Sequence, residues 1–257
     1  MFQYIARDLN TALHRKHTYV YVIGIFALCL IANIAVVAFR TIYGTNEGTY
    51  AYNIIEYATW CFVIPYYTCI CIADLGFGKT YPNPQIKDKI TKNMSRSAIY
   101  VAKLFVEFIL AVMFMVIAVL ALLGITTLFQ FRDGTISAYS VKDFLGKMVI
   151  AIPLWFAGVS FGNMFLFIFE NKKKAYIGFF LLTLVIPRVI MFFAAEPFSV
   201  PFLKFVRQYL ISQSFSLLPY PADPARNVTL IVLSGIIYAV VASIIGIVFY
   251  NKKEVKY

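Results

Sequence analysis

Six long apolar runs constrain this chain more than any other feature. A helix needs about 20 apolar residues to cross about 30 Å of hydrocarbon. Runs of about that length cover residues 18–39, 53–75, 104–130, 148–169, 175–195 and 228–250. The 257-residue chain is 61% hydrophobic and 14% charged, more apolar than a soluble domain of this size can bury. Because backbone groups in lipid must bond within their own segment, the sequence predicts an all-α membrane protein with six transmembrane helices, a single membrane domain over residues 1–257.

Lysine and arginine are distributed unevenly between the two ends of the spans. With the N-terminus inside, 15 of the 23 basic residues flank the inner ends, 7 flank the outer ends, and Arg188 lies within a span. Basic residues stay on the cytoplasmic side, so both termini are predicted to be cytoplasmic. The net charge of +11 therefore indicates topology and contact with anionic membrane lipids, and not nucleic-acid binding.

Two shorter segments are amphipathic. Residues 1–17 are predicted to form an interfacial helix, because Phe2, Ile5, Leu9 and Leu13 recur at helical spacing. A signal peptide is the rival interpretation, but no cleavage site followed by a polar mature start is present. The proline-bracketed residues 202–218 are too polar to span and are expected to form an outer re-entrant or surface helix before the last span.

Signatures of catalysis are incomplete. Gly78-Lys79-Thr80 ends like a phosphate loop, but Ala73 stands where the first glycine of that motif is needed. The run from Gly158 to Gly162 has the letters of a nucleophile elbow, yet it lies mid-span with no base at its depth. Its two glycines suit close helix packing instead. We expect no catalytic, cofactor or metal site in this chain, which is not predicted to be an enzyme.

Two of the charged residues within the spans lie away from the inner ends, and a charge in the membrane is costly unless it is paired or hydrated. Arg188 lies in the outer half of the fifth span, and Glu56 lies near the outer end of the second span. We predict that these two pair, or that both face an aqueous cleft between the two spans. The alternative is that Arg188 extends outward to the interface.

Aromatic residues crowd the second span. Tyr57, Trp60, Tyr66 and Tyr67 lie within it, and a tyrosine at mid-span needs a partner for its hydroxyl. They could line a cleft suited to a large amphipathic substrate. Helix packing and interface anchoring explain them equally well.

Two acids lie at inner span ends. Glu107 and Asp74 are expected to pair with Lys103 or Lys79 and not to form an ion pathway.

The inner loop over residues 76–103 is either a connector or a docking surface for a cytoplasmic partner. It holds Phe77-Gly78-Lys79-Thr80-Tyr81-Pro82-Asn83-Pro84, then Ser95-Arg96-Ser97 and Tyr100-Val101-Ala102-Lys103. With the six-span layout, these stretches resemble type-2 ABC exporter permeases, in particular the small permeases of lantibiotic-immunity and peptide-toxin (phenol-soluble-modulin-type) exporters. The two prolines depart from that pattern, which is more helical here.

The resemblance implies a division of labour. Separate ABC ATPase subunits would bind ATP and Mg, and two permeases, as a homodimer or with a paralogue, would form the pore in a bacterial plasma membrane. The loop would dock on the ATPase as a coupling helix through Lys79, Thr80, Tyr81, Asn83, Lys87, Lys89, Lys92 and Arg96.

The cargo implied by the resemblance is an amphipathic or antimicrobial-type peptide moved out of the cell. Drugs, lipids or polysaccharide are alternative cargoes for the same fold. A non-transporting membrane scaffold or sensor is the alternative from another class.

Overall fold

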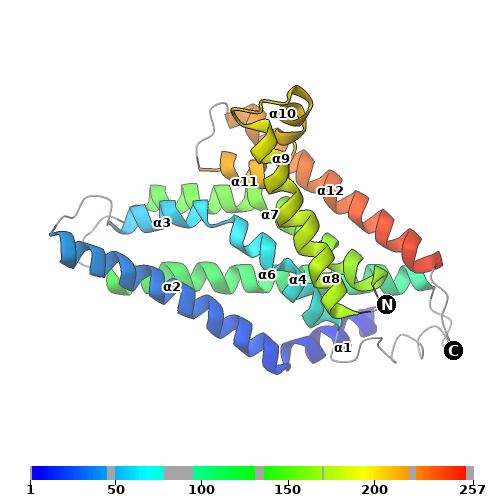
Figure 1. Cartoon of the computed structure of the whole chain (residues 1–257). Coiled ribbons are helices and arrows are strands. Elements are labelled where there is room, and N and C mark those ends of the chain that lie inside the picture. The colour runs from blue at the N-terminus through cyan, green and yellow to red at the C-terminus, as the bar shows by residue number, and fades with distance from the viewer. Residues whose placement is uncertain are drawn as a thin grey trace.

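The computed structural model describes residues 2–44, 50–77, 95–130, 136–169, 171–219 and 224–252, apart from the side chains of Phe2 and residues 224–226. All regular structure in these ranges is helical (Figure 1). The elements are α1 (Phe2–Leu13), α2 (Lys16–Tyr43), α3 (Ala51–Trp60), α4 (Val63–Phe77), α6 (Arg96–Phe129), α7 (Ala138–Ile168), α8 (Lys172–Phe180), the π-helical turn η2 (Leu181–Val185), α9 (Ile186–Ala194), α10 (Pro201–Arg207), α11 (Ile211–Leu217) and α12 (Pro224–Lys252).

The helices confirm a multi-pass membrane protein. Five are long and apolar enough to cross a bilayer: α2, α6, α7, the continuous run from α8 to α9, and α12. The pair α3 and α4 also qualifies if it is counted as one span, which gives up to six. The expectation of one unbroken second span over residues 53–75 is wrong, because α3 and α4 meet at a 59° bend.

The bend has a backbone cause. Pro65 has no N–H to donate to the carbonyl of Cys61, four residues earlier. The Cys61 carbonyl accepts a shorter-range bond from the Ile64 amide at 2.9 Å instead. The indole Nε1 of Trp155, on α7, donates to the Phe62 carbonyl at 2.8 Å. The bend is therefore tolerated in apolar surroundings, since its backbone groups find partners inside the protein.

Two other segments differ from expectation. The fifth span widens to a π-helical turn at η2, directly before Pro187, whose missing N–H removes one α-helical bond. The outer helix expected over residues 202–218 is two short helices, α10 and α11, separated by Gln208–Leu210. Neither short helix is long enough to span.

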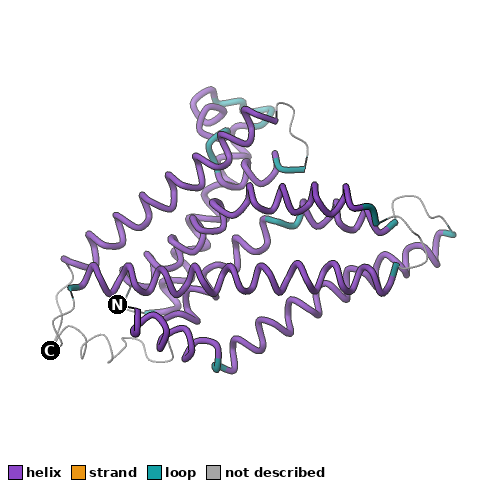
Figure 2. The backbone as a smooth tube through the Cα atoms, turned by 180° about the vertical axis from the view of Figure 1, so that it is seen from behind, coloured by secondary structure: helices purple, strands orange, loops and turns teal. Residues whose placement is uncertain are grey.

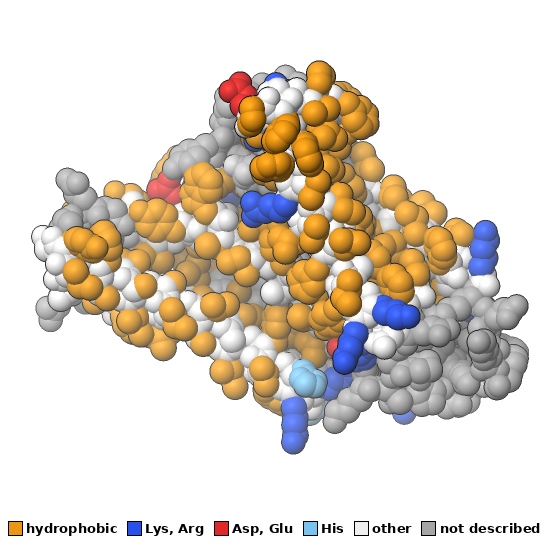
Figure 3. Space-filling view, viewed as in Figure 1, with side chains coloured by type: hydrophobic (Ala, Val, Ile, Leu, Met, Phe, Trp, Pro, Cys, Tyr) orange, Lys and Arg blue, Asp and Glu red, His pale blue; other side chains and the backbone are white. Residues whose placement is uncertain are grey.

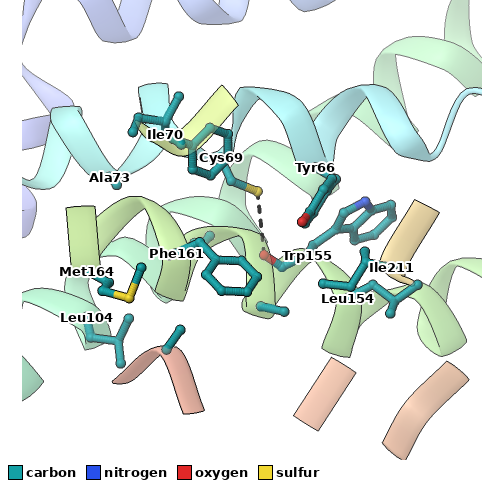
Figure 4. Packing of buried hydrophobic residues seen from close by; sticks show 14 of the residues in the cluster. Tyr66, Cys69, Ile70, Ala73, Leu104, Leu154, Trp155, Phe161, Met164 and Ile211 are labelled. Carbon is teal, nitrogen blue, oxygen red and sulfur yellow. Dashed lines mark hydrogen bonds between the residues drawn. The ribbon is translucent and has the colours of Figure 1, made fainter. Parts of the chain in front are cut away.

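Helix α7 lies at the centre of the bundle. Two thirds of its membrane window, 67%, is buried, against 6% for α2, so α7 packs on protein while α2 faces lipid. In Figures 1 and 2, α2, α3, α6 and α7 extend toward the same side of the molecule, whereas α9 and the start of α12 lie near α10 and α11, and α12 packs along α7. In the core, Tyr66 and Cys69 of α4 meet Trp155 of α7, whose carbonyl accepts from Cys69 Sγ at 3.5 Å (Figure 4).

Polar contacts hold the lipid-facing α2 to α6. Asn33 Nδ2 donates to Thr126 Oγ1 at 3.3 Å, and Arg40 donates to Gln130 Oε1 at 2.9 Å. Because lipid is as apolar as leucine, side-chain hydrogen bonds contribute to association where hydrophobic burial cannot.

Small residues bring α7 against its neighbours. A Cβ added at Gly158 would lie 2.8 Å from the Tyr66 ring and 2.9 Å from Cys69 Sγ, which confirms the predicted packing role of that glycine. On α12, a Cβ at Gly235 would lie 2.6 Å from the backbone carbonyl carbon of Pro153. The helix axes can approach this closely only because both positions lack a side chain.

One end of the bundle gathers both chain termini. It comprises α1, the start of α2, the ends of α4, α7 and α12, and the starts of α6 and α8, and we call it the terminus end (Figure 1). Figure 3 shows basic side chains collected there, while apolar side chains cover most of the remaining visible face. The start of α1 and the end of α12 therefore lie at the same end of the bundle. That both termini are cytoplasmic stays a prediction from the distribution of lysine and arginine.

Helix α1 packs on the bundle. Its apolar residues Ile5, Leu9 and Ala12 contact the cluster formed by α4 and α6, and Gln3, Arg7 and Asn10 are on the exposed side. We expected this apolar face to enter the headgroup layer, but much of it is covered by protein.

Substitution of Gly235 by alanine tests the close approach of α12 to α7. The new methyl group meets backbone atoms that cannot rotate away, so we expect Gly235→Ala to lower the free energy of unfolding by about 1–3 kcal/mol. Gly124 is the control, because nothing lies within 4 Å of a Cβ added there. Gly124→Ala should leave stability unchanged or raise it by up to about 1 kcal/mol, through helix propensity. Equal unfolding midpoints for the two variants in mixed micelles would contradict this packing.

Candidate functional site

A buried lysine joins three helices at the terminus end. Lys103, near the start of α6, has 3% of its side chain exposed, and its Nζ lies 2.6 Å from Asp8 Oδ2 of α1. The same Nζ donates a hydrogen bond to the Gly76 carbonyl, near the end of α4, at 2.8 Å. An unpaired ammonium in an apolar interior is costly, so these two acceptors explain why Lys103 is tolerated there. We call Asp8, Gly76 and Lys103 the clasp.

The local sequence positions each part of the clasp. Asp8 lies one turn after Tyr4, so both face α4 and α6. The Gly76 carbonyl is one of the last four carbonyls of α4, which accept no hydrogen bond from within the helix. Ser95 caps α6 by accepting a hydrogen bond from the Ala98 amide at 3.2 Å, so α6 begins at Arg96, inside the loop expected over residues 76–103.

Tyr4 supports the clasp from α1. Its ring lies 5.9 Å from Lys103 Nζ, within the range of a cation–π contact. Burial, together with the Asp8 carboxylate beside it, raises the pKa of the Tyr4 hydroxyl above its ordinary value. The hydroxyl therefore keeps its proton.

Glu107 lies one turn above Lys103 on α6. It is fully buried, at 0% exposure, and neither carboxyl oxygen has a hydrogen-bond partner among the described residues. Gly76 presses against it, since a Cβ added there would lie 2.7 Å from Glu107 Cγ. A buried carboxyl without donors is an unusual feature of a folded protein and marks this position as functional.

The Ser-Arg element at the start of α6 reaches α12. Arg96 Nη1 donates to the Asn251 carbonyl at 3.1 Å and to the Tyr250 carbonyl at 3.5 Å. Asn251 Nδ2 donates to Ser97 Oγ at 3.0 Å. A cation at the end of a helix satisfies carbonyls that lack helical partners and complements the helix dipole. The element thus joins the start of α6 to the end of α12.

A second ion pair joins α4 to α8. The Asp74 carboxylate binds Lys172 Nζ and accepts from the Tyr176 hydroxyl at 3.4 Å. Arg15, just before α2, donates to the Leu75 carbonyl next to it. The end of α4 is therefore bonded to α6, to α8 and to Arg15 at the start of α2, and Lys103 links it to α1.

Two expected pairings are wrong. Lys103 pairs with Asp8 of α1 and not with Glu107. Asp74 was expected to pair with a lysine of the adjoining loop or of α6, and pairs with Lys172 of α8 instead. Both true partners lie far away in the sequence, and only the packing of the helices brings them together.

Of the residues predicted to contact an ATPase, Arg96 is described, and it contacts α12 as stated above. The others fall outside the described residues: Lys79, Thr80, Tyr81, Asn83, Lys87, Lys89 and Lys92. Their role in coupling stays a prediction. The described chain ends on either side of them at Phe77 and Ser95.

The proposed intramembrane pair is not brought together among the described ion pairs. Arg188 is exposed on α9 and lies within electrostatic range of Tyr67 on α4. Glu56 is half-buried on α3. The pairing of Glu56 with Arg188 stays a prediction.

The aromatic residues of the second span divide between core and surface. Tyr66 is 3% exposed and packs against Phe215 of α11 at 5.7 Å between ring centroids. Tyr57 and Trp60 are exposed, and Tyr67 is half-buried beside Tyr66. Tyr66 is thus a core residue in this structure, and a cleft lined by the other three stays a prediction.

A groove of about 420 Å³ opens on the far end of the bundle, between α7, α11 and α12. Its wall is mainly apolar, and Lys142 and Lys147 lie at its edge. Lys147 is bonded there to Asp143 at 2.7 Å. The groove thus combines an apolar wall with basic side chains, as an amphiphilic molecule would require.

No protein-family model matches this chain, and a comparison with curated proteins finds no relative. The structure therefore establishes a multi-pass helical membrane protein, and the family stays a resemblance.

The clasp was missed by the sequence reasoning, although one signal could have found half of it. Asp8 lies on the apolar face of α1, beside Ile5, Leu9 and Ala12. An acid on an apolar helix face requires a buried cation, and that requirement points to a lysine in a nearby span. Nothing local to Lys103 or Gly76 identifies them as its partners.

Substitution of Asp74 tests the second ion pair. Asp74→Asn removes the carboxylate that binds Lys172 and Tyr176, so we expect the free energy of unfolding to fall by about 1–2 kcal/mol. Asp143→Asn is the matched control, because Asp143 is exposed and pairs with Lys147 one turn away on the same helix, so its loss should cost less than about 0.5 kcal/mol. Thermal unfolding of both variants in the same lipid gives the comparison. A loss for Asp143→Asn as large as for Asp74→Asn would contradict the assignment.

Proposed function

We propose that this chain is the membrane-spanning permease subunit of an ATP-driven exporter. Separate ABC ATPase subunits dock on the segment between α4 and α6, and ATP and Mg bind in those subunits. The transporter contains a second permease, either another copy of this chain or a paralogue. Its cargo is an amphipathic or antimicrobial-type peptide.

One observation carries this proposal. The two helices that flank this segment are bonded to each other, because Lys103, about two turns into α6, donates to the Gly76 carbonyl near the end of α4. The same two helices are bonded to α1 through Asp8, to α8 through Asp74 and to α12 through Arg96. A displacement applied to that segment would therefore move several helices together, as coupling between an ATPase and a pore requires.

The distribution of burial supports a transport role. Helix α7 is covered by protein along most of its membrane window, and the second span is bent beside it. Bent or interrupted spans inside a membrane occur where the protein interior or a cavity satisfies their backbone. The apolar groove with lysines at its edge supports an amphiphilic cargo.

Replacement of three lysines tests the docking of an ATPase. We expect the combined substitution of Lys87, Lys89 and Lys92 by glutamine to abolish co-purification of a partner ABC ATPase, because it removes three charges from the docking segment. The control is the combined substitution of Lys142, Lys204 and Arg207 by glutamine, which removes three charges at the far end and should leave the yield unchanged.

Co-purification at wild-type yield with the three loop lysines replaced would contradict docking at this segment. The cargo is tested separately, by ATP hydrolysis of the complex in nanodiscs. Amphipathic cationic peptides should stimulate it at least several-fold. Stimulation by lipid or drug alone would assign the alternative cargoes, and no hydrolysis with any addition would favour a non-transporting scaffold.

A further inference from the structure

Glu107 is the most deeply buried acid of the described chain. Its side chain has 0% exposure, it lies in an apolar span, and neither carboxyl oxygen has a hydrogen-bond partner among the described residues. An ionised carboxylate in such a place lacks both solvent and donors, at a cost of several kcal/mol. A neutral carboxylic acid avoids most of that cost.

Among the described residues, Lys103 is the basic residue that interacts electrostatically with Glu107, and its ammonium group is already bonded to other acceptors. Lys103, one turn away, points its Nζ to Asp8 at 2.6 Å and to the Gly76 carbonyl at 2.8 Å. An ammonium has three donors, and Asp8 and the Gly76 carbonyl engage two of them here. The positive charge of Lys103 is therefore balanced by Asp8.

Among the described residues, the other titratable groups that interact with Glu107 supply no positive charge. Asp74, from α4, is an acid within electrostatic range, and it is bonded to Lys172. Tyr4 of α1 and Tyr100 of α6 also interact with Glu107 electrostatically, and both are neutral hydroxyls. From α12, Tyr250 lies near Tyr4.

Beyond Glu107, other buried polar atoms of the described residues, on α6, α7 and α12, also lack hydrogen-bond partners. The Tyr100 hydroxyl lies near both Glu107 and the Asn163 amide of α7. Within the described part of the chain, both atoms of that amide and the Tyr250 hydroxyl are buried without hydrogen-bond partners. Buried polar groups of this kind are normally satisfied by a bound species. These side chains could exchange a proton with water at the terminus end.

We propose that Glu107 is a proton-binding site, occupied while Lys103 is held by Asp8 and Gly76. On binding, a proton from water forms an O–H bond with one carboxyl oxygen, and the charge of the side chain changes from −1 to 0. On release, the carboxylate attracts Lys103, which is one turn away on the same helix, and weakens the bond between Lys103 and Asp8. Proton occupancy thus controls the contact between α1 and α6. This site goes beyond the proposed exporter function and does not depend on an ATPase.

Infrared spectroscopy of the full chain in lipid vesicles tests the site directly. At pH 7 an exposed glutamate is about 99.8% ionised, so a protonated side-chain carboxyl band at that pH identifies a proton-binding glutamate. We expect such a band in the wild type, its shift on labelling with glutamate carrying ¹³C in the side-chain carboxyl, and its loss in Glu107→Gln. Glu196→Gln is the control, because Glu196 is exposed at the far end of the bundle, and should keep the band.

A second variant separates the site from its link to the clasp. Asp8→Asn leaves Glu107 in place but frees Lys103, so Glu107 should ionise and the band should disappear. A carboxyl band that survives in Asp8→Asn would overturn the proposal that Lys103 moves from Asp8 toward Glu107 when Glu107 releases its proton. A wild-type protein without the band, or a spectrum of Glu107→Gln that retains it, would overturn the proton-binding site. The ¹³C shift is measured on the wild type, so the test stands even if Glu107→Gln does not fold.

Discussion

The burial of the Lys103 ammonium is the constraint on which the terminus end of this protein depends. A charge at that depth requires acceptors, and the acceptors it uses come from two other helices, Asp8 of α1 and the Gly76 carbonyl of α4. The amphipathic α1 is therefore fixed to the spans and not merely adsorbed at the membrane surface. The helices on either side of the segment between α4 and α6 are likewise bonded to each other through Lys103. Arg96 and Asp74 extend the same arrangement to α12 and α8.

The membrane interior is organised by a different interaction. Close backbone approach brings α12 and α4 onto α7 at Gly235 and Gly158, so α7 becomes a buried core helix and α2 is left to face lipid. The bend between α3 and α4 fits this scheme, because Trp155 of α7 satisfies the Phe62 carbonyl that the bend exposes. An interior assembled in this way can be rigid in its core while its outer helices move against lipid. Such an arrangement is compatible with the proposed transport cycle.

The sequence predicted the spans well and their polar contacts poorly. A long apolar run indicates a helix that lies in lipid and not in water. The all-α architecture and five unbroken spans therefore follow from the apolar runs of the sequence alone. The bend at Pro65 could be suspected from the proline, but whether a span breaks depends on a partner such as Trp155, which is distant in the sequence. The clasp depends on the packing of three helices, and single-sequence periodicity cannot define which residues of different helices meet. Glu107 was placed correctly near the start of its span, yet its lack of hydrogen-bond partners among the described residues became visible only with the neighbouring helices in place.

The central claim is that the buried pair of Asp8 and Lys103 holds α1 to the spans. A double-mutant cycle tests it most directly, with Asp8→Asn, Lys103→Met and the combined variant unfolded in the same mixed micelles. Methionine keeps most of the length of lysine without its charge, so the cycle isolates the ionic contact. The account predicts a coupling free energy of about 2 kcal/mol or more, with the double variant less destabilised than the sum of the single variants. Additivity within about 0.5 kcal/mol would contradict it.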